Sequence, residues 1–579
     1  MNYKDRAERW LSSDQVSDQD KAIIKKADDH LLNDMFGADI EFGTAGLRGE
    51  IGPGTNRLNT LVVRRATVGL GNFVIKKYGA EGKRRGVAVS FDNRRMSAIF
   101  SSEVCTILND MGINTFSFAC PHPTPELSYT VRECKCVAGV MITASHNPAK
   151  YNGYKVYDET GCQMVYENID GLMAEINKLP DFLDIKVKKA DKNGTNNVLG
   201  ENFDEKFITR EADTSIIKGV GDSTRHVKIV YTPQCGTNVY LGPACLRKCG
   251  YVVTSVPGQD RWDSEFDGVE FPNPEFDVAW VKAKALLLKL HEKDPEYTIA
   301  ICNDPDADRV GLGFIGKDGQ FHRYTGNQTG ALLIDFILGE RKKQGTLPKD
   351  GVLYNSFVTS SFGAAIAAKK YGMTIKYVPT GFKYIGYAIE HSNKPFVFGY
   401  EESYGYLTKE FVRDKDCLQS NVAIADMAED CARKGIAIDE KFAQLEKEFG
   451  HYVTALKNIY FDGIVGRKKL ADKLDELRAN PVDALAGDKV VAVDDYLNSV
   501  HYDARSGTKT KIADIPSLDC IKYFFADGWL AIRPSGTEPK CKIYCEAVAP
   551  SDEEGNRLAN AIIEALDKHL DLDSLNVDK

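Results

Sequence analysis

Residues 298–309 read TIAICNDPDADR, a short apolar run that is followed at once by a polar loop. Runs of β-branched and apolar residues of this length are typical of buried strands. The same order occurs in VAGVMI (137–142) before TASHNP (143–148), and in GVAVSF (86–91) before DNRR (92–95). Helical stretches separate these units. Such alternation predicts α/β layers with largely parallel sheets.

Three more strand-like runs lead into polar segments further along the chain. They are VLYNSF before VTSS (358–361), PFVFGY before EESYG (401–405), and WLAI before RPSGTE (533–538). In sheets of this class ligands gather at the carboxyl ends of the strands. We therefore predict that six polar segments, scattered in sequence, supply binding loops.

The length of 579 residues is too great for one hydrophobic core and predicts several domains. The polar stretch 188–206 is typical of a surface linker. We predict four domains with bounds at 1–203, 204–325, 326–450 and 451–579. No short-period repeat or low-complexity tract is present in the sequence.

Composition and charge restrict the class of partner. The formal net charge of −9 and the pI near 5.7 disfavour sequence-blind attraction to nucleic acid or anionic lipid. No apolar run approaches the length of a membrane span, and the first 15 residues lack the apolar core of a signal peptide. We expect a cytoplasmic protein with no nucleic-acid or membrane partner. Most of the fourteen cysteines lie in apolar runs, which predicts reduced core thiols.

The loop NDPDADR carries three carboxylates, Asp304, Asp306 and Asp308. They alternate along an extended segment and can project toward one point. Hard carboxylate ligands suit Mg²⁺, the usual ion where phosphate is also bound. The alternative is a solvated acidic turn or helix cap. The buried-looking strand before the loop and Arg309 after it favour the metal.

Ser145 follows the apolar strand 137–142 and has His146 beside it. A serine that acts in phosphoryl transfer needs activation and an electrostatic sink for negative charge. Taken alone, this segment is also compatible with a capped turn. Lys155 is a candidate cation and proton carrier, although a single lysine is usually solvated surface.

Two further segments suit binding of a phosphosugar. RPSGTEPK (533–540) combines a guanidinium, two hydroxyls and a glycine, the composition of a phosphate cradle, although a tight surface turn would have a similar sequence. Glu401 can accept hydrogen bonds from vicinal sugar hydroxyls, and Ser403 can also donate to them. Alternatively, Glu401 and Glu402 could be charged residues exposed to solvent. Lys415 restores positive charge just downstream.

These constellations, in this order, resemble the α-D-phosphohexomutase family over residues 42 to 540. The similar segments are FGTAGLRG, TASHNP, DPDADR, TGFKYIG, GYEESYGY and RPSGTEPK. TASHNP and DPDADR are highly specific in combination, whereas TGFKYIG alone is weak. The resemblance implies an α/β protein of four domains around one cleft. Three of these are related α/β domains, and the last is a smaller α+β lid.

The resemblance also implies a role for each matching residue. Ser145 would be the phosphorylated serine, and Asp304, Asp306, Asp308 and a phosphoserine oxygen at Ser145 would hold Mg²⁺. Around the transferred phosphoryl group the implied residues are Arg48, His146, Lys155 and Arg309. The implied substrate-binding residues are Thr380, Gly381, Glu401, Ser403, Lys415, Arg533, Ser535, Gly536 and Thr537.

The runs 399–416 and 42–59 are similar to the branch of the family that contains bacterial α-phosphoglucomutases and phosphopentomutases. The resemblance therefore implies an intramolecular phosphotransferase that interconverts glucose 1-phosphate and glucose 6-phosphate, with glucose 1,6-bisphosphate as intermediate and activator. Phosphomannomutase and phosphopentomutase activities are the alternatives. A catalytically silent sugar-phosphate sensor and a metal-dependent phosphatase are the hypotheses of other classes. The sequence does not predict the oligomeric state.

Overall fold

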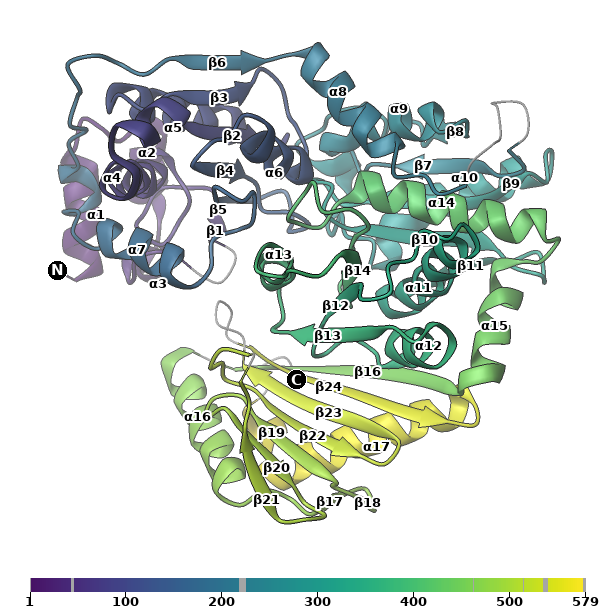
Figure 1. Ribbon diagram of the computed structural model, residues 1–579. Coiled ribbons are helices and arrows are strands. Elements are labelled where there is room, and N and C mark those ends of the chain that lie inside the picture. Colours follow the sequence, from purple (N-terminus) through teal and green to yellow (C-terminus); the bar gives the residue numbers. More distant parts are fainter. Residues whose placement is uncertain are drawn as a thin grey trace. The chain divides into compact units, whose positions relative to one another are not determined.

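A computed structural model describes residues 2–42, 46–217, 225–461, 463–513, 515–534 and 540–575 (Figure 1). The chain divides into two compact units. The first contains residues 1–355 and 381–438, and the second contains residues 356–380 and 439–579. In the described ranges no helix combines the length and apolar character that a membrane crossing requires.

The first unit begins with three short helices that start at side-chain caps. They are α1 (Tyr3–Ser12), α2 (Asp18–Lys26) and α3 (Asp29–Phe36). Asn2, Ser17 and Asp28 each accept a hydrogen bond from a backbone N–H of the first turn, which satisfies a donor that the helix itself leaves unpaired. Trp10 and Phe36 of these helices belong to the core of the first sheet.

The first sheet has six strands in the order β1-β5-β4-β2-β3-β6. Their bounds are β1 (Leu47–Glu50), β2 (Val87–Phe91), β3 (Thr115–Phe118), β4 (Ala138–Ile142), β5 (Tyr151–Asp158) and β6 (Asn196–Leu199). Strands β4, β2, β3 and β6 are parallel, whereas β5 is antiparallel to β4 and β1 is antiparallel to β5. Helices α4 (Thr60–Arg85), α5 (Ser97–Asp110) and α7 (Tyr166–Ile176) contribute to one core, and α6 (Thr124–Glu133) contributes to another.

The linker prediction is wrong for the second half of the stretch 188–206. This half contains β6 and the start of α8 (Glu201–Ala212). Strand β6 pairs with β3, and Thr115 and Ser117 donate side-chain hydrogen bonds to Asn196 at 2.9 and 2.8 Å. A polar sequence therefore forms an edge strand because its side-chain amide is satisfied by the neighbouring strand.

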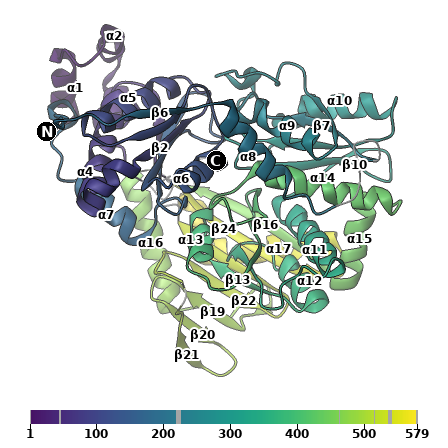
Figure 2. The same cartoon turned by 45° about the horizontal axis from the view of Figure 1, so that its top comes forward.

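The second sheet has the order β11-β10-β9-β7-β8. Its strands are β7 (Lys228–Thr232), β8 (Val252–Ser255), β9 (Tyr297–Asn303), β10 (Val310–Ile315) and β11 (Phe321–Tyr324). Its helices are α9 (Leu241–Lys248), α10 (Val281–His291) and α14 (Cys417–Arg433). Figure 2 shows α10 on one side of this sheet and α14 on the other. The aspartate loop is the connection from β9 to the antiparallel strand β10.

The third group of strands in this unit is β12 (Val352–Ser356), β14 (Phe396–Glu401) and β15 (Gly405–Leu407). Strand β14 is parallel to β12, and β15 turns back antiparallel to β14. Helices α11 (Gly326–Lys343) and α13 (Phe382–Glu390) belong to the same region. Here too a polar segment from the sequence, residues 401–405, lies at the carboxyl end of a buried strand.

The second unit contains a seven-stranded antiparallel sheet of the order β16-β24-β23-β22-β19-β20-β21. The strands are β16 (His451–Tyr460), β19 (Ala492–Asp495), β20 (Val500–Asp503), β21 (Thr508–Lys511), β22 (Ile521–Phe525), β23 (Gly528–Pro534) and β24 (Lys540–Ala549). Leucines and isoleucines of α16 (Gly463–Ala479) and α17 (Asp552–Leu570) build the core on one face. The run WLAI thus lies in an antiparallel sheet, unlike the other five strand-like runs, because a tight hairpin joins β22 to β23.

The remaining elements of the second unit are short. They are α12 (Phe362–Tyr371), β13 (Thr374–Val378), α15 (Ile438–Phe449), β17 (Ala484–Leu485) and β18 (Asp488–Lys489). Phe357 and Val358 pack with Tyr496, Trp529 and Tyr544 in a separate core. All fourteen cysteines are free and most are buried, which agrees with the prediction of core thiols.

Gly153 of β5 allows the backbones of β1 and of the segment after β4 to pass close to β5, where a larger residue would not fit. A Cβ added there would lie 2.3 Å from the carbonyl oxygen of Thr143 and 2.8 Å from that of Leu47. Both obstacles are backbone atoms, one in β1 and one directly after β4, so neither can rotate away. We expect Gly153→Ala to lower the free energy of unfolding by about 3 kcal/mol, measured by urea denaturation.

Gly52→Ala is the matched control, since a Cβ at Gly52 meets no atom within 4 Å. It should change the free energy of unfolding by less than about 0.5 kcal/mol. Equal losses in the two variants would contradict this account of the sheet.

Candidate active site

Ser145 lies in the loop that follows β4, and its backbone is strained. Its φ of 52° is in the left-handed region, which side chains with a Cβ rarely adopt. Its N–H donates to the hydroxyl of Thr143 at 2.8 Å. The side chain is buried, and its Oγ donates to Oδ2 of Asp304 at 2.9 Å. The loop therefore holds the serine hydroxyl against the aspartate loop.

The three aspartates converge, as predicted, in the short connection between β9 and β10. One carboxylate oxygen of each lies within 4.8 Å of the others, and all three side chains are buried. Oδ1 of Asp304 accepts hydrogen bonds from the N–H groups of Asp308 at 3.0 Å and Arg309 at 2.8 Å. Among the described residues, Oδ1 of Asp306 and Oδ1 of Asp308 have no hydrogen-bond partner. Two buried, unpaired carboxylate oxygens beside a third carboxylate fit a small divalent cation such as Mg²⁺.

Two lysines balance part of the negative charge. Nζ of Lys155 donates to Oδ2 of Asp306 at 2.8 Å and to Oδ2 of Asp308 at 3.2 Å, and Nζ of Lys415 lies 3.1 Å from the latter. Burial opposes the charged form of Lys155, but the two aspartates outweigh it and raise the pKa of Lys155 above its ordinary value. Burial likewise opposes ionisation of Asp306, whose pKa is nevertheless held below its ordinary range by Lys155. Lys155 is therefore a cation that is committed to the aspartates.

His146 and two arginines surround the serine loop. Nδ1 of His146 lies 3.2 Å from Oγ of Ser145. Desolvation, together with the charges of Arg309 and Arg48, holds the pKa of His146 well below its ordinary value. Arg48 donates to the side-chain oxygen of Asn147 at 3.1 Å. The histidine ring is therefore neutral and lies beside the serine hydroxyl.

Glu401 ends strand β14, and Ser403 lies in the turn to β15. The backbone N–H of Val310, next to Arg309, donates to the carbonyl of Tyr404 at 3.0 Å. Burial raises the pKa of Glu401 to about 7, although Lys415 and Arg309 oppose the shift. The first unit thus brings the serine loop, the aspartate loop and the glutamate turn into one neighbourhood.

The other sequence-predicted residues are placed differently. Gly381, with a φ of 113°, immediately precedes α13 in the first unit. Thr380 and Arg533 belong to the second unit, where Arg533 lies on β23. Ser535, Gly536 and Thr537 lie outside the described residues.

Sequence reasoning missed Arg94, which organises the serine loop. Its buried guanidinium faces Asp92, with Nε 3.0 Å from Oδ2. Its two terminal nitrogens donate to four backbone carbonyls, those of Ser145 (2.6 Å), Asn147 (2.6 Å), Pro148 (2.9 Å) and Tyr151 (3.1 Å). The segment DNRR was singled out as a polar strand-end loop, but nothing in one sequence distinguishes Arg94 from Arg95.

Thr124 was also missed, because no motif marks it. Its N–H donates to the carbonyl of Asp306 at 2.9 Å, and its hydroxyl donates to Oδ2 of Asp306 at 3.0 Å. The start of α6 therefore supports the aspartate loop from behind.

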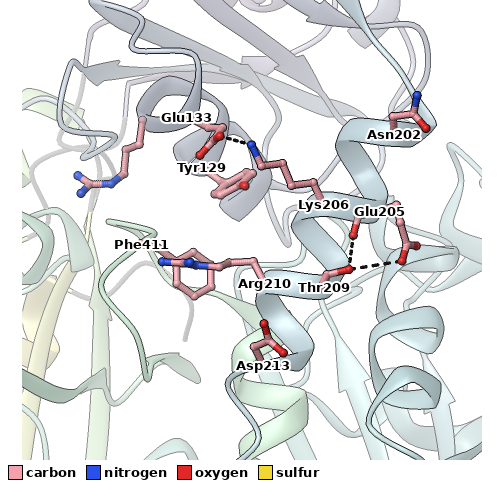
Figure 3. Close-up of a pocket in the computed structure, with 10 residues that line it drawn as sticks. Tyr129, Glu133, Asn202, Glu205, Lys206, Thr209, Arg210, Asp213 and Phe411 are labelled. Atoms are coloured by element: carbon pink, nitrogen blue, oxygen red, sulfur yellow. Dashed lines mark hydrogen bonds and ion pairs between the residues drawn. The ribbon is translucent and has the colours of Figure 1, made fainter.

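A hollow of about 750 Å³ lies elsewhere on the first unit, between α6 and α8 (Figure 3). Lys206 forms an ion pair with Glu133, and the guanidinium of Arg210 lies over the ring of Phe411. None of the residues that line this hollow belongs to the serine, aspartate or glutamate loops. It is distinct from the candidate active site.

A strained serine held against three converging carboxylates and flanked by lysines and arginines defines an enzyme that transfers phosphoryl groups. Four family models match the chain. They describe phosphoglucomutase/phosphomannomutase α/β/α domain I (residues 39–181), domain II (209–315), domain III (325–449) and the C-terminal domain (468–565). The chain belongs to the phosphoglucomutase/phosphomannomutase family and is a mutase, with the predicted fold class of three α/β domains and a C-terminal domain.

Curated relatives and solved structures agree with this membership. A phosphoglucomutase of Staphylococcus haemolyticus is 33% identical over 88% of this chain and 90% of its own. A phosphoglucomutase of Staphylococcus aureus is 31% identical over 95% of this chain and 99% of its own. The crystal structure of a phosphomannomutase from Thermus thermophilus, described as putative, matches with a TM-score of 0.65 and 22% identity, over 92% of this chain and 99% of its own.

Arg94 generates a prediction about the serine loop. Arg94→Ala leaves Asp92 buried without its partner and frees four carbonyls, so we expect a loss of about 3–5 kcal/mol in the free energy of unfolding. Arg94→Lys keeps the charge but not the fork of donors. The lysine variant should be more stable than the alanine variant. Phosphorylation of its Ser145 by a sugar bisphosphate, followed by intact mass, should nevertheless be about tenfold slower than in the parent.

Arg95→Ala is the control, because Arg95 is exposed and makes an ion pair with Glu265 on the surface. It should behave as the parent in both measurements. If the lysine variant at position 94 phosphorylates Ser145 at the parental rate, the guanidinium does not position the loop.

Proposed function

We propose that this enzyme is a phosphoglucomutase that interconverts glucose 1-phosphate and glucose 6-phosphate through phosphorylated Ser145 and a glucose 1,6-bisphosphate intermediate. The observation that carries the proposal is the hydroxyl of Ser145, which lies 2.9 Å from Asp304. The loop of Asp304 also carries the unpaired oxygens of Asp306 and Asp308. The names of the relatives at 31–33% identity support the choice of glucose. Phosphomannomutase and phosphopentomutase remain the alternatives.

The proposed reaction has two transfers. In the first, the bond between phosphorus and Oγ of Ser145 breaks, and a bond forms to the free hydroxyl oxygen of the sugar monophosphate. In the second, the other phosphate of the bisphosphate returns a phosphoryl group to Ser145. Positioning and electrostatic stabilisation account for most of the catalysis of such transfers. Phosphoserine is therefore restored at the end of each cycle.

The residues of the first unit have distinct parts in this scheme. Nδ1 of His146, 3.2 Å from Oγ of Ser145, is placed to hold the proton that moves between serine and sugar hydroxyl. Lys155 supplies positive charge instead, because it donates to two aspartates. Arg309 and Arg48 flank the phosphoryl group. The three aspartates and an oxygen at Ser145 would hold Mg²⁺, which would supply positive charge to offset that of the phosphoryl oxygens.

Binding of the sugar is assigned to the residues at the end of β14 and to its neighbours. Glu401 and Ser403 would hold two hydroxyls, and Lys415 and Gly381 lie in the same unit. Roles for Thr380, Arg533, Ser535, Gly536 and Thr537 in binding the substrate and its distal phosphate rest on the sequence resemblance. Glucose 1,6-bisphosphate would also serve as the activator that loads Ser145.

Two further parts of the proposal concern the cellular location and the domain bounds. We place the reaction in the cytoplasm, where fourteen free cysteines stay reduced. We also propose domains at 1–203, 204–325, 326–450 and 451–579. The matched segments 39–181, 209–315 and 468–565 each lie within one proposed domain, and the segment 325–449 begins one residue before the third, which supports the division.

Ser145→Ala tests the covalent step. We expect active parent enzyme to carry one phosphoryl group at Ser145, detected by intact mass and peptide mapping, and the alanine variant to lose turnover at least about 10³-fold. Ser101→Ala, at a buried serine of α5, is the control and should keep both the phosphate and the activity. A phosphate mapped to another residue, or near-parental turnover without Ser145, would sink the relay.

Glu401→Gln tests the sugar-binding step and the substrate class. The assay is run at about pH 8, where Glu401, whose pKa is about 7, is largely ionised. Loss of hydrogen bonds to a charged group is worth about 1.5–3 kcal/mol, so kcat/KM for glucose 1-phosphate should fall about 10- to 100-fold. Loading of Ser145 by glucose 1,6-bisphosphate should change less. The assays compare glucose, mannose and ribose 1-phosphates with the parent enzyme and with Glu402→Gln as the neighbouring control.

A parent enzyme that prefers ribose 1-phosphate would overturn the choice of glucose while leaving the mutase assignment intact. An equal effect of the two glutamine variants would remove the specific role of Glu401.

A further inference from the structure

A second group of metal-ligating side chains lies outside the aspartate loop, at the starts of α6 and α8. It consists of His122, Glu126 and Asp204. One ligand atom from each lies within 4.8 Å of the other two. His122 precedes α6, Glu126 lies in its first turn, and Asp204 lies in the first turn of α8. One imidazole and two carboxylates are a donor set that suits a divalent transition-metal ion.

Glu126 is the observation that points to a ligand. Its side chain has no solvent exposure, and neither of its carboxylate oxygens has a hydrogen-bond partner among the described residues. The charged groups that face it are His122, which favours the carboxylate, and Asp204 and Asp416, which oppose it. A buried carboxylate without a partner is costly, so the site requires either a proton or a cation.

His122 is oriented as metal-binding histidines usually are. Its Nδ1 lies 2.8 Å from the carbonyl oxygen of Cys120, and a carbonyl can only accept, so Nδ1 carries the proton. Its Nε2 lies 3.2 Å from Oδ1 of Asp204. The ring also stacks on Phe118 at a centroid distance of 4.0 Å. Burial opposes the charged form of the ring, but Asp204, Cys120 and Glu126 outweigh it and raise the pKa of His122 to about 10. Without a metal, Nε2 therefore carries a proton that faces Asp204, and a bound cation would take the place of that proton.

Helix α8 separates this group from the hollow of Figure 3. Asn202, Lys206 and Arg210 line the hollow, whereas Asp204 and Glu211, seven residues apart, share another face of the helix. Glu211 is also buried, with no hydrogen-bond partner for either oxygen among the described residues. The side chain of Asp204 is 22% exposed, which leaves an entry path for an ion.

We propose that His122, Glu126 and Asp204 form a second metal site, which binds Zn²⁺ or an ion of similar chemistry and has a structural role. Thr124, between two of the ligands, donates to Asp306 through its N–H and its hydroxyl. An ion bound at this site would tie the start of α6 to α8 and so hold Thr124 in its contact with the aspartate loop. The site is separate from the Mg²⁺ ligands and does not depend on which sugar phosphate is the substrate.

The experiment measures zinc on the full-length protein in excess Mg²⁺, which occupies the aspartate loop. After dialysis against Zn²⁺ and removal of free ion, metal analysis should find one zinc per chain in the parent. His122→Gln should bind zinc at least about 100-fold more weakly, whereas His322→Gln should bind as the parent does. His322 is a matched control because it pairs with Asp318 on the surface. Asp306→Asn should keep its zinc.

A measurement that keeps His122 covers the case in which the His122→Gln variant does not fold. Cu²⁺ should show nitrogen coupling in its electron paramagnetic resonance spectrum when it is bound to a His451→Gln variant in excess Mg²⁺. The Mg²⁺ occupies the aspartate loop beside His146, and the substitution removes the other group of one histidine and two carboxylates, Glu446, His451 and Asp552. Zinc should also raise the Tm of the parent and not that of the His122→Gln variant. No zinc on the parent, no nitrogen coupling, or equal zinc on parent and His122→Gln would each overturn the proposal and leave Glu126 as a protonated acid.

Discussion

The buried ion pair between Asp92 and Arg94 is the constraint on which the rest of the site depends. Both side chains are inaccessible to solvent. The terminal nitrogens of the guanidinium donate hydrogen bonds to four backbone carbonyls after β4. A buried pair of this kind does not by itself add much stability. It specifies one conformation of the loop, and that conformation places the hydroxyl of Ser145 against Asp304 with a φ that the chain would otherwise avoid.

Charge balance is the second constraint, and it explains why the aspartates need neighbours from several elements. Three carboxylates in one buried loop repel each other, and this repulsion, after burial, raises the pKa of Asp304 well above its ordinary value. Lys155 on β5 and Lys415 before α14 offset part of the charge, and yet one oxygen each of Asp306 and Asp308 stays unpaired. A cation and the phosphate of a substrate are the complementary charges that such a site is built to receive.

The sequence predicted the strand-end loops and the convergence of the aspartates. These predictions depend on short segments, in which an apolar strand and a polar loop are adjacent in the chain. The position of Ser145 beside Asp304, 159 residues away, was implied only by the family resemblance. The roles of Arg94 and Thr124 could not be predicted, since their partners lie about 50 and 180 residues away and nothing local marks them. The polar edge strand β6 was missed for the same reason: its Asn196 is satisfied only by β3.

The three sheets of the first unit place their functional loops at the same kind of connection. In each, a buried parallel strand is followed by an antiparallel neighbour: β4 by β5, β9 by β10, and β14 by β15. Ser145, the aspartates and Ser403 occupy these three reversals. A crossover helix would carry the chain away from the carboxyl edge, whereas a reversal starts the next strand at that edge. Arg309 therefore stays beside the aspartates, and Lys155 of β5 donates to Asp306 and Asp308. These antiparallel reversals could not be predicted from the alternation of strands and helices in the sequence. Strand β5 is buried along almost its whole length, so it lacks the alternation of apolar and polar residues that would distinguish it from a parallel strand.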